Sequence, residues 1–251
     1  INYITNQTIT ILKLTIYNIL PILLPTLILS NILISSNLPY IINKYLHINP
    51  IYILSIITGS PTNAHILNNY NNITKILSLT NYTSLLFTYN YLTKIYNNKI
   101  SILLIILNIL TNIIIYIIIK PNKITFKNNN TNIITSLTNS IKQTKDTLLI
   151  IITSSIFYSI LPTSLIKNKY LKSLLLSITE ITTSLHNLSI INIPNNIKLL
   201  FTCITLSTTG LCIQTQILSI TNNINIKEYI KNRLLHLVIY LILVYITIIL
   251  L

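Results

Sequence analysis

The chain has 251 residues, of which 51% are hydrophobic and only 8% are charged. Soluble domains carry about 25% charged residues, so this composition excludes an ordinary water-soluble domain and indicates an integral membrane protein. Seventeen basic residues and only three acids (Asp146, Glu180 and Glu228) give a net charge of +14. Lysines gather in cytoplasmic loops of membrane proteins, and a basic surface also favours an anionic solute or anionic lipid. Nucleic-acid binding would need a folded basic face interleaved with aromatics, so we expect no nucleic-acid partner.

The first apolar stretch runs from Ile9 to Ile34 and contains Pro21 and Pro25. Proline removes a helical hydrogen bond, so we expect these two residues to kink a spanning helix and to act as structural anchors. The stretch lacks a short apolar core followed by a small-residue cleavage site, which favours a spanning segment over a signal peptide. Because about 20 apolar residues cross a bilayer, further spans are predicted at Ile100 to Ile119, Thr147 to Ile166 and Leu234 to Leu251.

Residues 121–146 form the most polar part of the chain and hold four lysines. We interpret this part as a polar loop followed by an amphipathic helix. It separates an N-terminal membrane half, residues 1–120, from a C-terminal membrane half, residues 147–251. The predicted fold class is all-α, a polytopic transmembrane helical bundle with two re-entrant or broken helical hairpins.

Each half contains one apolar segment with a breaker in its middle, and each breaker holds one of the only two glycines. The first hairpin is predicted near 51–69, where the break reads Gly59-Ser60-Pro61-Thr62-Asn63-Ala64. The second is predicted near 199–220, where the break ends at Gly210 and the apolar run resumes through Gln214 and Gln216. Interrupted apolar segments in the two halves of a chain mark the binding sites of transporters.

The first break has the pattern of a helix start. Ser60 is a good N-cap and Pro61 suits the first helical position. The first backbone N–H groups of such a helix have no intrahelical partner, and its N-terminus carries partial positive charge, so a carboxylate fits there. The alternative is a kinked helix in which the break is purely architectural. In the second break, Gln214 and Gln216 are two residues apart and point different ways on a regular helix, although each amide can bond a neighbouring helix or line a polar cavity.

Glu180 is the only acid inside a markedly apolar stretch, residues 174–184. An intramembrane acid is a functional candidate, as a proton relay, a cation ligand or the partner of a basic residue; the alternative is an interfacial position. Asn81, Thr83 and Ser84 belong to a second polar group that either lines a cavity or reflects compositional drift. The histidines, cysteines and acids show no metal-ligand spacing, and no phosphate loop or nucleophile–base pair occurs. We therefore expect no enzyme, no metal and no cofactor, with a coupling ion, H⁺ or Na⁺, left open.

Seven short motifs, in order, resemble those of the YlbJ-like sporulation integral membrane proteins, which carry the nucleoside-recognition (gate) domain. The break at Gly59 to Ala64 resembles "S-G-x-P-x-x-A-K", with departures at Asn63 and His65. The others are Pro21 to Pro25 ("P-S-L-F-P"), Thr80 to Ser84 ("T-N-T-S-N-P"), Ser136 to Ile141 (an amphipathic entry), Glu180 to Thr183, including Thr182 ("E-I-T-x-G"), Gly210 to Gln216 ("G-L-S-V-x-x-Q") and Arg233 to His236 ("R-L-L-H").

The resemblance implies a relative of concentrative nucleoside transporters, with paired re-entrant hairpins meeting at mid-membrane. It further implies a multi-pass protein of the cell membrane or of the outer forespore membrane, with dipicolinate export during endospore formation as its role. Our first hypothesis is a transporter for an anionic or nucleoside-like solute, in which Gly59 to Ala64 and Gly210 to Gln216 form the hairpin tips. Glu180, Asn81, Thr83, Ser84 and Thr182 line the site, and Arg233 anchors the last helix or pairs with Glu180.

Two alternatives stay open: a non-transporting structural membrane protein, and an organelle-encoded subunit of a larger complex. The expected partners are the lipid bilayer, the solute and, as an open case, further copies of the chain.

Overall fold

The structure is a computed structural model that describes residues 2–14, 16–17, 20–21, 24–25, 28–29, 32, 38–46, 51–52, 59–60, 62–68, 70, 72–121, 133–221 and 224–250. Within these ranges the chain forms helices and connecting segments and no strand, which confirms the predicted all-α class.

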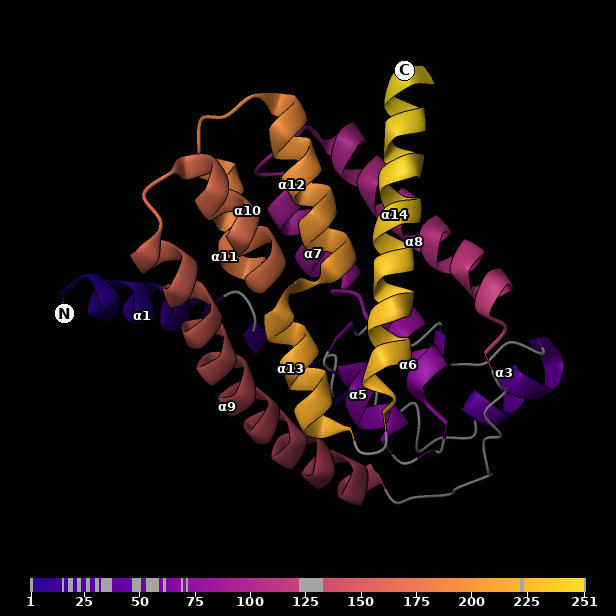
Figure 1. The fold of residues 1–251 in the computed structure, drawn as a ribbon. Helices are drawn as coiled ribbons and strands as arrows, with labels where there is room; N and C mark the ends of the chain where they lie inside the picture. Colours follow the sequence, from indigo (N-terminus) through magenta and orange to yellow (C-terminus); the bar gives the residue numbers. More distant parts are fainter. Residues whose placement is uncertain are drawn as a thin grey trace.

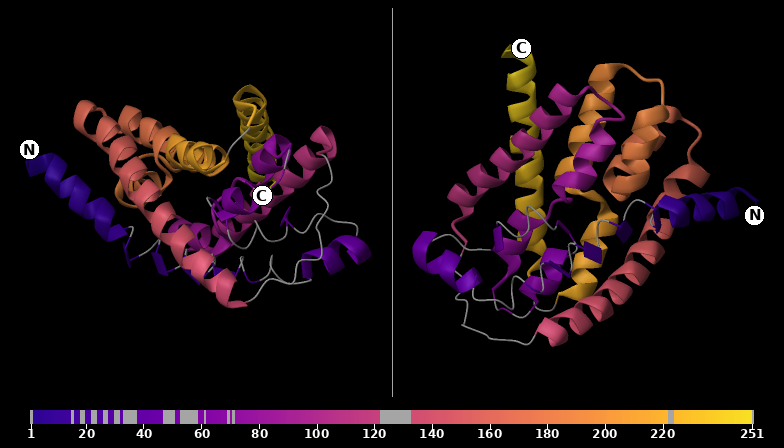
Figure 2. Two further views of the ribbon diagram at one scale, coloured as in Figure 1. Left: turned by 90° about the horizontal axis from the view of Figure 1, so that it is seen from below. Right: turned by 180° about the vertical axis from the view of Figure 1, so that it is seen from behind.

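The first half contains six labelled helices: α1 (Asn2–Leu14), α3 (Leu38–Leu46), α5 (Thr62–Leu67), α6 (Thr74–Thr80), α7 (Leu85–Leu92) and α8 (Asn98–Ile119). The second half contains α9 (Ile133–Leu165), α10 (Lys169–Thr179), α11 (Ile181–Ile190), α12 (Asn195–Thr208), α13 (Gly210–Ile220) and α14 (Ile226–Leu250). Figure 1 shows α14 beside α12, with α9 running along the lower edge of the molecule. The views from below and behind show α14 standing between α8 and α12 (Figure 2).

Three helical segments of the described chain are long and apolar enough to cross a membrane. They are Asn98–Ile119, Asn195–Ile220 and Ile226–Ile249, with mean hydropathies of 2.8, 1.4 and 2.0. Only 28% of the most apolar part of α8 is buried, and α14 has the same value. Both helices therefore present aliphatic side chains outward, such as Ile106 and Ile242. A surface of this kind indicates association with a membrane.

The predicted span at Ile100 to Ile119 is confirmed by α8, which ends where Lys120 adopts a left-handed conformation. The predicted span at Leu234 to Leu251 lies, as far as Leu250, inside α14, which begins eight residues earlier, at Ile226, and has Tyr229, Asn232 and Arg233 buried in its first turns. The predicted span at Thr147 to Ile166 lies almost wholly inside α9, and the predicted amphipathic entry helix is the first part of the same helix. Pro21 and Pro25 are exposed, but a kink at either one would involve neighbours outside the described residues.

The second half contains a hairpin that was not expected, formed by α10 and α11. Ser173 accepts a hydrogen bond from Asn187 (2.9 Å), and the hydroxyls of Ser177 and Ser184 are 3.2 Å apart. From the first pair to the second, the residue number rises on α10 (173 to 177) and falls on α11 (187 to 184), so the two helices are antiparallel. Glu180 is therefore the tip of a tight helical hairpin.

The hairpin predicted near 199–220 is instead one interrupted helix. The helix stops at Thr208, passes through Thr209 and Gly210, both with positive φ, and resumes as α13. Figure 1 shows α13 continuing downward from the end of α12 and not turning back beside it. These two left-handed residues interrupt the helix without reversing the chain, so the apolar run keeps its direction.

The first half repeats this plan. Gly59 lies at the tip of the segment that leads into α5, and the helix that follows is interrupted at residues 81–84, between α6 and α7. Residues 53–58, the first arm of the hairpin predicted near 51–69, lie outside the described residues. Gly59 and Ser60, named the first tip, lie beside the break at residues 81–84, and Glu180, named the second tip, lies beside the break at Thr209 and Gly210.

One apolar cluster joins the two halves around these breaks. Its members come from α5, α6 and α7 in the first half and from α11, α13 and α14 in the second, and include Leu67, Leu77, Leu185, Ile217 and Tyr229. A second cluster packs α8 against α12 and α14 through Leu104, Leu206 and Tyr240. Because the larger cluster surrounds the breaks, apolar packing holds the two interrupted helices together at the breaks.

Candidate functional site

The candidate site is the place where the two tips and the two interrupted helices meet. At the first tip, Gly59 has φ +68°, and a Cβ built on it would lie 2.3 Å from the backbone nitrogen of Ser84. Glycine is therefore required at this position for two reasons. Its backbone is left-handed, and Thr83 and Ser84, which precede α7, approach it closely. The next residue, Ser60, donates its backbone N–H to the carbonyl of Tyr82 (2.8 Å). The tip is bonded directly to the break in the neighbouring helix.

Side chains strengthen this contact. The hydroxyl of Ser60 donates to Oδ1 of Asn81 (2.6 Å) and to Oδ1 of Asn63 (3.1 Å). The amide of Asn63, which is fully buried, donates to the carbonyl of Thr80 (2.7 Å). Ala64 is also fully buried and belongs to the apolar cluster around the breaks. The tip is thus held by three polar side chains and one small apolar residue.

The predicted helix start at the first tip is only partly confirmed. Thr62 begins α5, which has six residues, and the hydroxyl of Ser60 bonds side chains and not the first N–H groups. The N–H of Asn63 donates to the carbonyl of Gly59 (3.3 Å), so the N–H groups of Ser60 and Asn63, two of the donors predicted to bind a carboxylate, already have partners in this conformation. The placement of Pro61 lies outside the described residues, as do the surroundings of the Thr62 side chain.

Asn81 connects the two breaks. Its amide nitrogen donates to the hydroxyl of Thr209 (3.2 Å), in the interruption between α12 and α13, and to the hydroxyl of Tyr229 on α14. Its oxygen accepts from Ser60, so one fully buried side chain contacts the first tip, the second break and the last helix. An unpaired amide would cost several kcal/mol in hydrocarbon, and this network satisfies it.

The second tip is closed by its own acid. The carboxylate of Glu180 accepts from the backbone N–H of Thr182 (3.1 Å), and from the N–H (2.5 Å) and hydroxyl (2.6 Å) of Thr183. Glu180 is 1% exposed and has an extended backbone, so it acts as the N-cap of α11. A carboxylate at a helix N-terminus is stabilised by the unpaired donors and by the helix dipole. The predicted site residue is central, but its observed contacts are those of a cap.

Gly210 brings the second interrupted helix against this tip. A Cβ on Gly210 would lie 3.1 Å from the carbonyl oxygen of Thr179 and 3.3 Å from the Cα of Glu180. The hydroxyl of Thr208 also donates to the carbonyl of Ser177 (3.3 Å) on the hairpin. The second tip and the second break are therefore neighbours, as are the first tip and the first break.

The two glutamines point to different places, as their spacing predicted. Gln214 turns back to the break, where its amide nitrogen donates to the carbonyl of Thr208 (2.7 Å) and to the hydroxyl of Thr209 (3.3 Å). Gln216 faces α9 and donates to the hydroxyl of Ser154 (2.9 Å). Gln214 thus belongs to the candidate site and Gln216 to a helix–helix contact.

Arg233 is buried and binds the carboxyl ends of both interrupted helices. Its guanidinium donates to the carbonyl of Ser78 in the last turn of α6 (3.2 Å) and to the carbonyl of Ser207 in the last turn of α12. Each helix end carries roughly −0.5 elementary charge on carbonyls without intrahelical partners, so two of them together balance one guanidinium. The predicted anchor role is supported, while the alternative pairing with Glu180 is not seen because both groups are engaged elsewhere.

Thr83 and Ser84 complete the first break. Ser84 is the N-cap of α7 and accepts from the N–H of Phe87 (3.4 Å). The hydroxyl of Thr83 lies 2.7 Å from that of Thr88. These two threonines line a small cavity of about 20 Å³, which is large enough for one water molecule, with Asn108 and Asn112 of α8 also lining it. The side-chain oxygens of both asparagines are buried and without a hydrogen-bond partner.

Sequence reasoning missed Tyr229, Asn232 and His236, which lie with Arg233 on the buried side of α14. Asn232 donates to the hydroxyl of Ser78 (3.0 Å), next to the Arg233 contact. The spacing of these residues, at 229, 232, 233 and 236, is the three-to-four-residue period of one helix face. Polar residues that recur with this period in an apolar helix predict a buried polar face, so this spacing could have identified them from the sequence.

Within the described residues, no group of three or more histidine, cysteine or acidic side chains could hold a metal ion. Comparisons with protein-family models, with curated proteins and with solved structures found no match for the chain.

Proposed function

We propose that the chain is a multi-pass membrane transporter for a small polar or anionic solute. The observation that carries this proposal is the contact between the two breaks, in which Asn81 of the first donates to Thr209 of the second. Non-helical backbone at membrane depth is tolerated only where it is buried in protein or lines a water-filled cavity. Two such interruptions that face each other, each with a tip against it, match the arrangement by which transporters bind a solute at the midplane.

In this proposal the described conformation is closed. Gly59, Asn81, Thr209 and Gly210 are all buried, and the polar groups around them bond one another. A solute would enter where the Asn81–Thr209 contact separates and would replace the lost hydrogen bonds with its own. Arg233 would keep the carboxyl ends of α6 and α12 together during that movement, so that the second tip moves relative to a fixed pair of half-helices.

The solute class follows from the groups available. Asn81, Gln214, Thr209 and Tyr229 offer neutral donors and acceptors, and the chain has a net charge of +14. These features suit a small polar molecule or an anion. Dipicolinate and nucleosides are the first solutes to test, and a forespore membrane is the first location, because of the ordered motifs that resemble the sporulation proteins.

The second candidate function is a non-transporting structural membrane protein. The observation that favours it is that Glu180, Asn63 and Asn81 all bond within the protein. In that case the breaks only shape the bundle and the polar residues hold its helices together.

Cysteine accessibility distinguishes the two functions. Cys203 and Cys212 are both buried, so we would replace both with serine and introduce single cysteines at Ser60 and Thr83, which are partly exposed at the first tip and first break. Control cysteines at Thr111, buried on α8, and Ile113, on its outer face, should stay unreactive toward a membrane-impermeant thiol reagent. A transporter that opens should react at position 60 or 83 and be protected by its solute.

The companion measurement is efflux of radiolabelled dipicolinate and nucleosides from reconstituted vesicles. Protein-dependent flux together with protected cysteines supports the transporter. Inertness at both positions together with absence of flux for every solute would favour the structural protein.

A further inference from the structure

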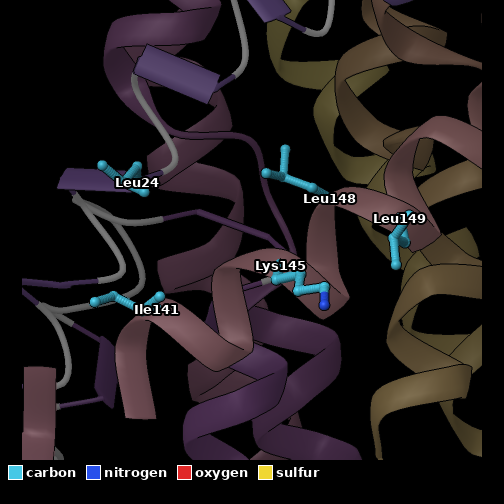
Figure 3. A pocket seen from close by; sticks show the side chains of 5 residues that line it. All are labelled: Leu24, Ile141, Lys145, Leu148 and Leu149. Atoms are coloured by element: carbon cyan, nitrogen blue, oxygen red, sulfur yellow. The ribbon is translucent and has the colours of Figure 1, made fainter. Parts of the chain in front are cut away.

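An apolar groove lies away from the breaks, between the first part of α9 and the segment around Leu24. It has a volume of about 370 Å³ and is lined by Leu24, Ile141, Leu148 and Leu149, with one charged side chain, Lys145 (Figure 3). Three of its aliphatic residues are open, with Ile141 62%, Leu149 56% and Leu24 38% exposed. A binding site for a small apolar group has this size and this lining.

The predicted span at Thr147 to Ile166, in the second part of α9, places the groove at the boundary between hydrocarbon and headgroups. With 33 residues, α9 is about 50 Å long, whereas the hydrocarbon core of a bilayer is about 30 Å thick. One end must therefore lie outside the hydrocarbon unless the helix is strongly tilted. The end with Lys142, Lys145 and Asp146, all exposed, is the polar one, and the helix turns apolar from Leu148 onward.

Charge decides which lipid fits. Lys145 is the one charged side chain that lines the groove, and Asp146, the next residue, is rotated by about 100° from it, toward the side of Lys142. An ammonium group beside an aliphatic groove suits a molecule with an anionic head and a hydrocarbon tail. We propose that this groove binds an anionic phospholipid, with an acyl chain along Leu24, Ile141, Leu148 and Leu149 and its phosphate at Lys145. This site is independent of the transported solute.

The test uses the absence of tryptophan from the chain. Leu149→Trp places a fluorescent reporter in the groove, and Phe157→Trp places a matched one about two turns along the same helix, where the replaced side chain is 60% exposed. Each protein is reconstituted in phosphatidylcholine vesicles that contain brominated phosphatidylglycerol or brominated phosphatidylcholine as a minor component. Bromine quenches tryptophan only at contact range, so quenching reports which lipid sits beside each reporter.

We expect the apparent affinity at Leu149→Trp to be about fivefold higher for the anionic lipid, which corresponds to about 1 kcal/mol from one lysine. Adding Lys145→Gln should bring the ratio close to one, and Lys145→Arg should keep it. Phe157→Trp should show no preference in any background. Far-ultraviolet circular dichroism of each variant confirms that the helices are formed.

Three results overturn the proposal. One is equal quenching by both lipids at position 149. Another is a preference that survives Lys145→Gln or that appears equally at position 157, since the net charge alone would then account for it. The third is absence of lipid quenching at position 149, which would mean that another protein segment or a second copy covers the groove.

Discussion

The two halves pack a tip against an interrupted helix in opposite ways. In the first half the glycine is on the tip, Gly59, and the polar connector, Asn81, is in the interrupted helix. In the second half the glycine is in the interrupted helix, Gly210, and the polar residue, Glu180, is on the tip. The glycine can lie on either of the two segments in contact, because a close approach needs only one of the two backbones to lack a Cβ.

The halves also differ in how tightly the contact is made. Around Gly59 the nearest atoms to an added Cβ lie 2.3 to 2.9 Å away, whereas around Gly210 they lie 3.1 to 3.3 Å away. The first tip is bonded to its neighbour through Ser60 and Asn63, while Glu180 mainly bonds its own helix. We infer that the first contact is the fixed one and that the second separates more easily.

The largest expected effect separates the two glycines. Gly59→Ala forces a Cβ into the Ser84 backbone and strains a left-handed residue, so we expect a loss of about 3 kcal/mol or more in unfolding free energy. Gly210→Ala meets gentler contacts and should lose about 1–2 kcal/mol, mostly from the positive φ. Unfolding of the detergent-solubilised protein by a denaturing detergent measures both. Equal losses would contradict the inferred asymmetry.

The next effect concerns the residue that joins the halves. Arg233→Met removes the donors of two buried carbonyls, on Ser78 and Ser207, each of which costs about 1–3 kcal/mol when left unpaired. We expect a loss of about 2–4 kcal/mol by the same measurement. Arg233→Lys is the control, because an ammonium can reach one carbonyl and should recover about half of the loss. A Met variant as stable as the natural protein would show that the bridge does not form.

Much of this fold could be predicted from sequence because apolar length is a local property. An unbroken apolar run predicted the span in α8. Glycines within apolar stretches predicted the breaks at Gly59 and Gly210. The hairpin of α10 and α11 was not visible, because its tip has neither glycine nor proline. Glu180 turns the chain with an ordinary extended backbone and its own carboxylate as cap, and glutamate is not among the preferred capping residues.

The composition of the site was harder to predict than its position. Asn81 and Glu180 were expected near it, and the structure places both at the breaks. Their partners could not be identified from the chain, since Asn81 and Tyr229 are 148 residues apart and Arg233 bonds backbone carbonyls, which carry no sequence signal. Long-range pairs of this kind depend on how the helices pack, and packing is a property of the whole bundle.

A smaller effect tests the second tip. Glu180→Gln places an amide nitrogen against the N–H groups that now donate hydrogen bonds to the carboxylate. We expect a loss of about 1 kcal/mol in unfolding free energy, the value of a helix cap. Insertion should be intact, while flux in reconstituted vesicles should fall strongly if the carboxylate takes part in transport. Glu180→Asp, which can still accept from Thr183, is the control for the cap alone. Unchanged flux in the Gln variant would limit Glu180 to its structural role.

The smallest expected effect lies at the contact between the two halves, the hydrogen bond from Asn81 to Tyr229. A double-mutant cycle with Asn81→Ala and Tyr229→Phe should give a coupling energy of about 0.6 kcal/mol, and no more than about 1.7 kcal/mol, as for other hydrogen bonds between membrane helices. The control cycle pairs Asn81→Ala with Tyr240→Phe, because Tyr240 lies on the same helix but donates to Leu104. That cycle should be additive within about 0.5 kcal/mol. A Tyr229 coupling as small as that of the control would mean that the halves are mostly apart in the membrane, and the closed conformation would then be the minor one.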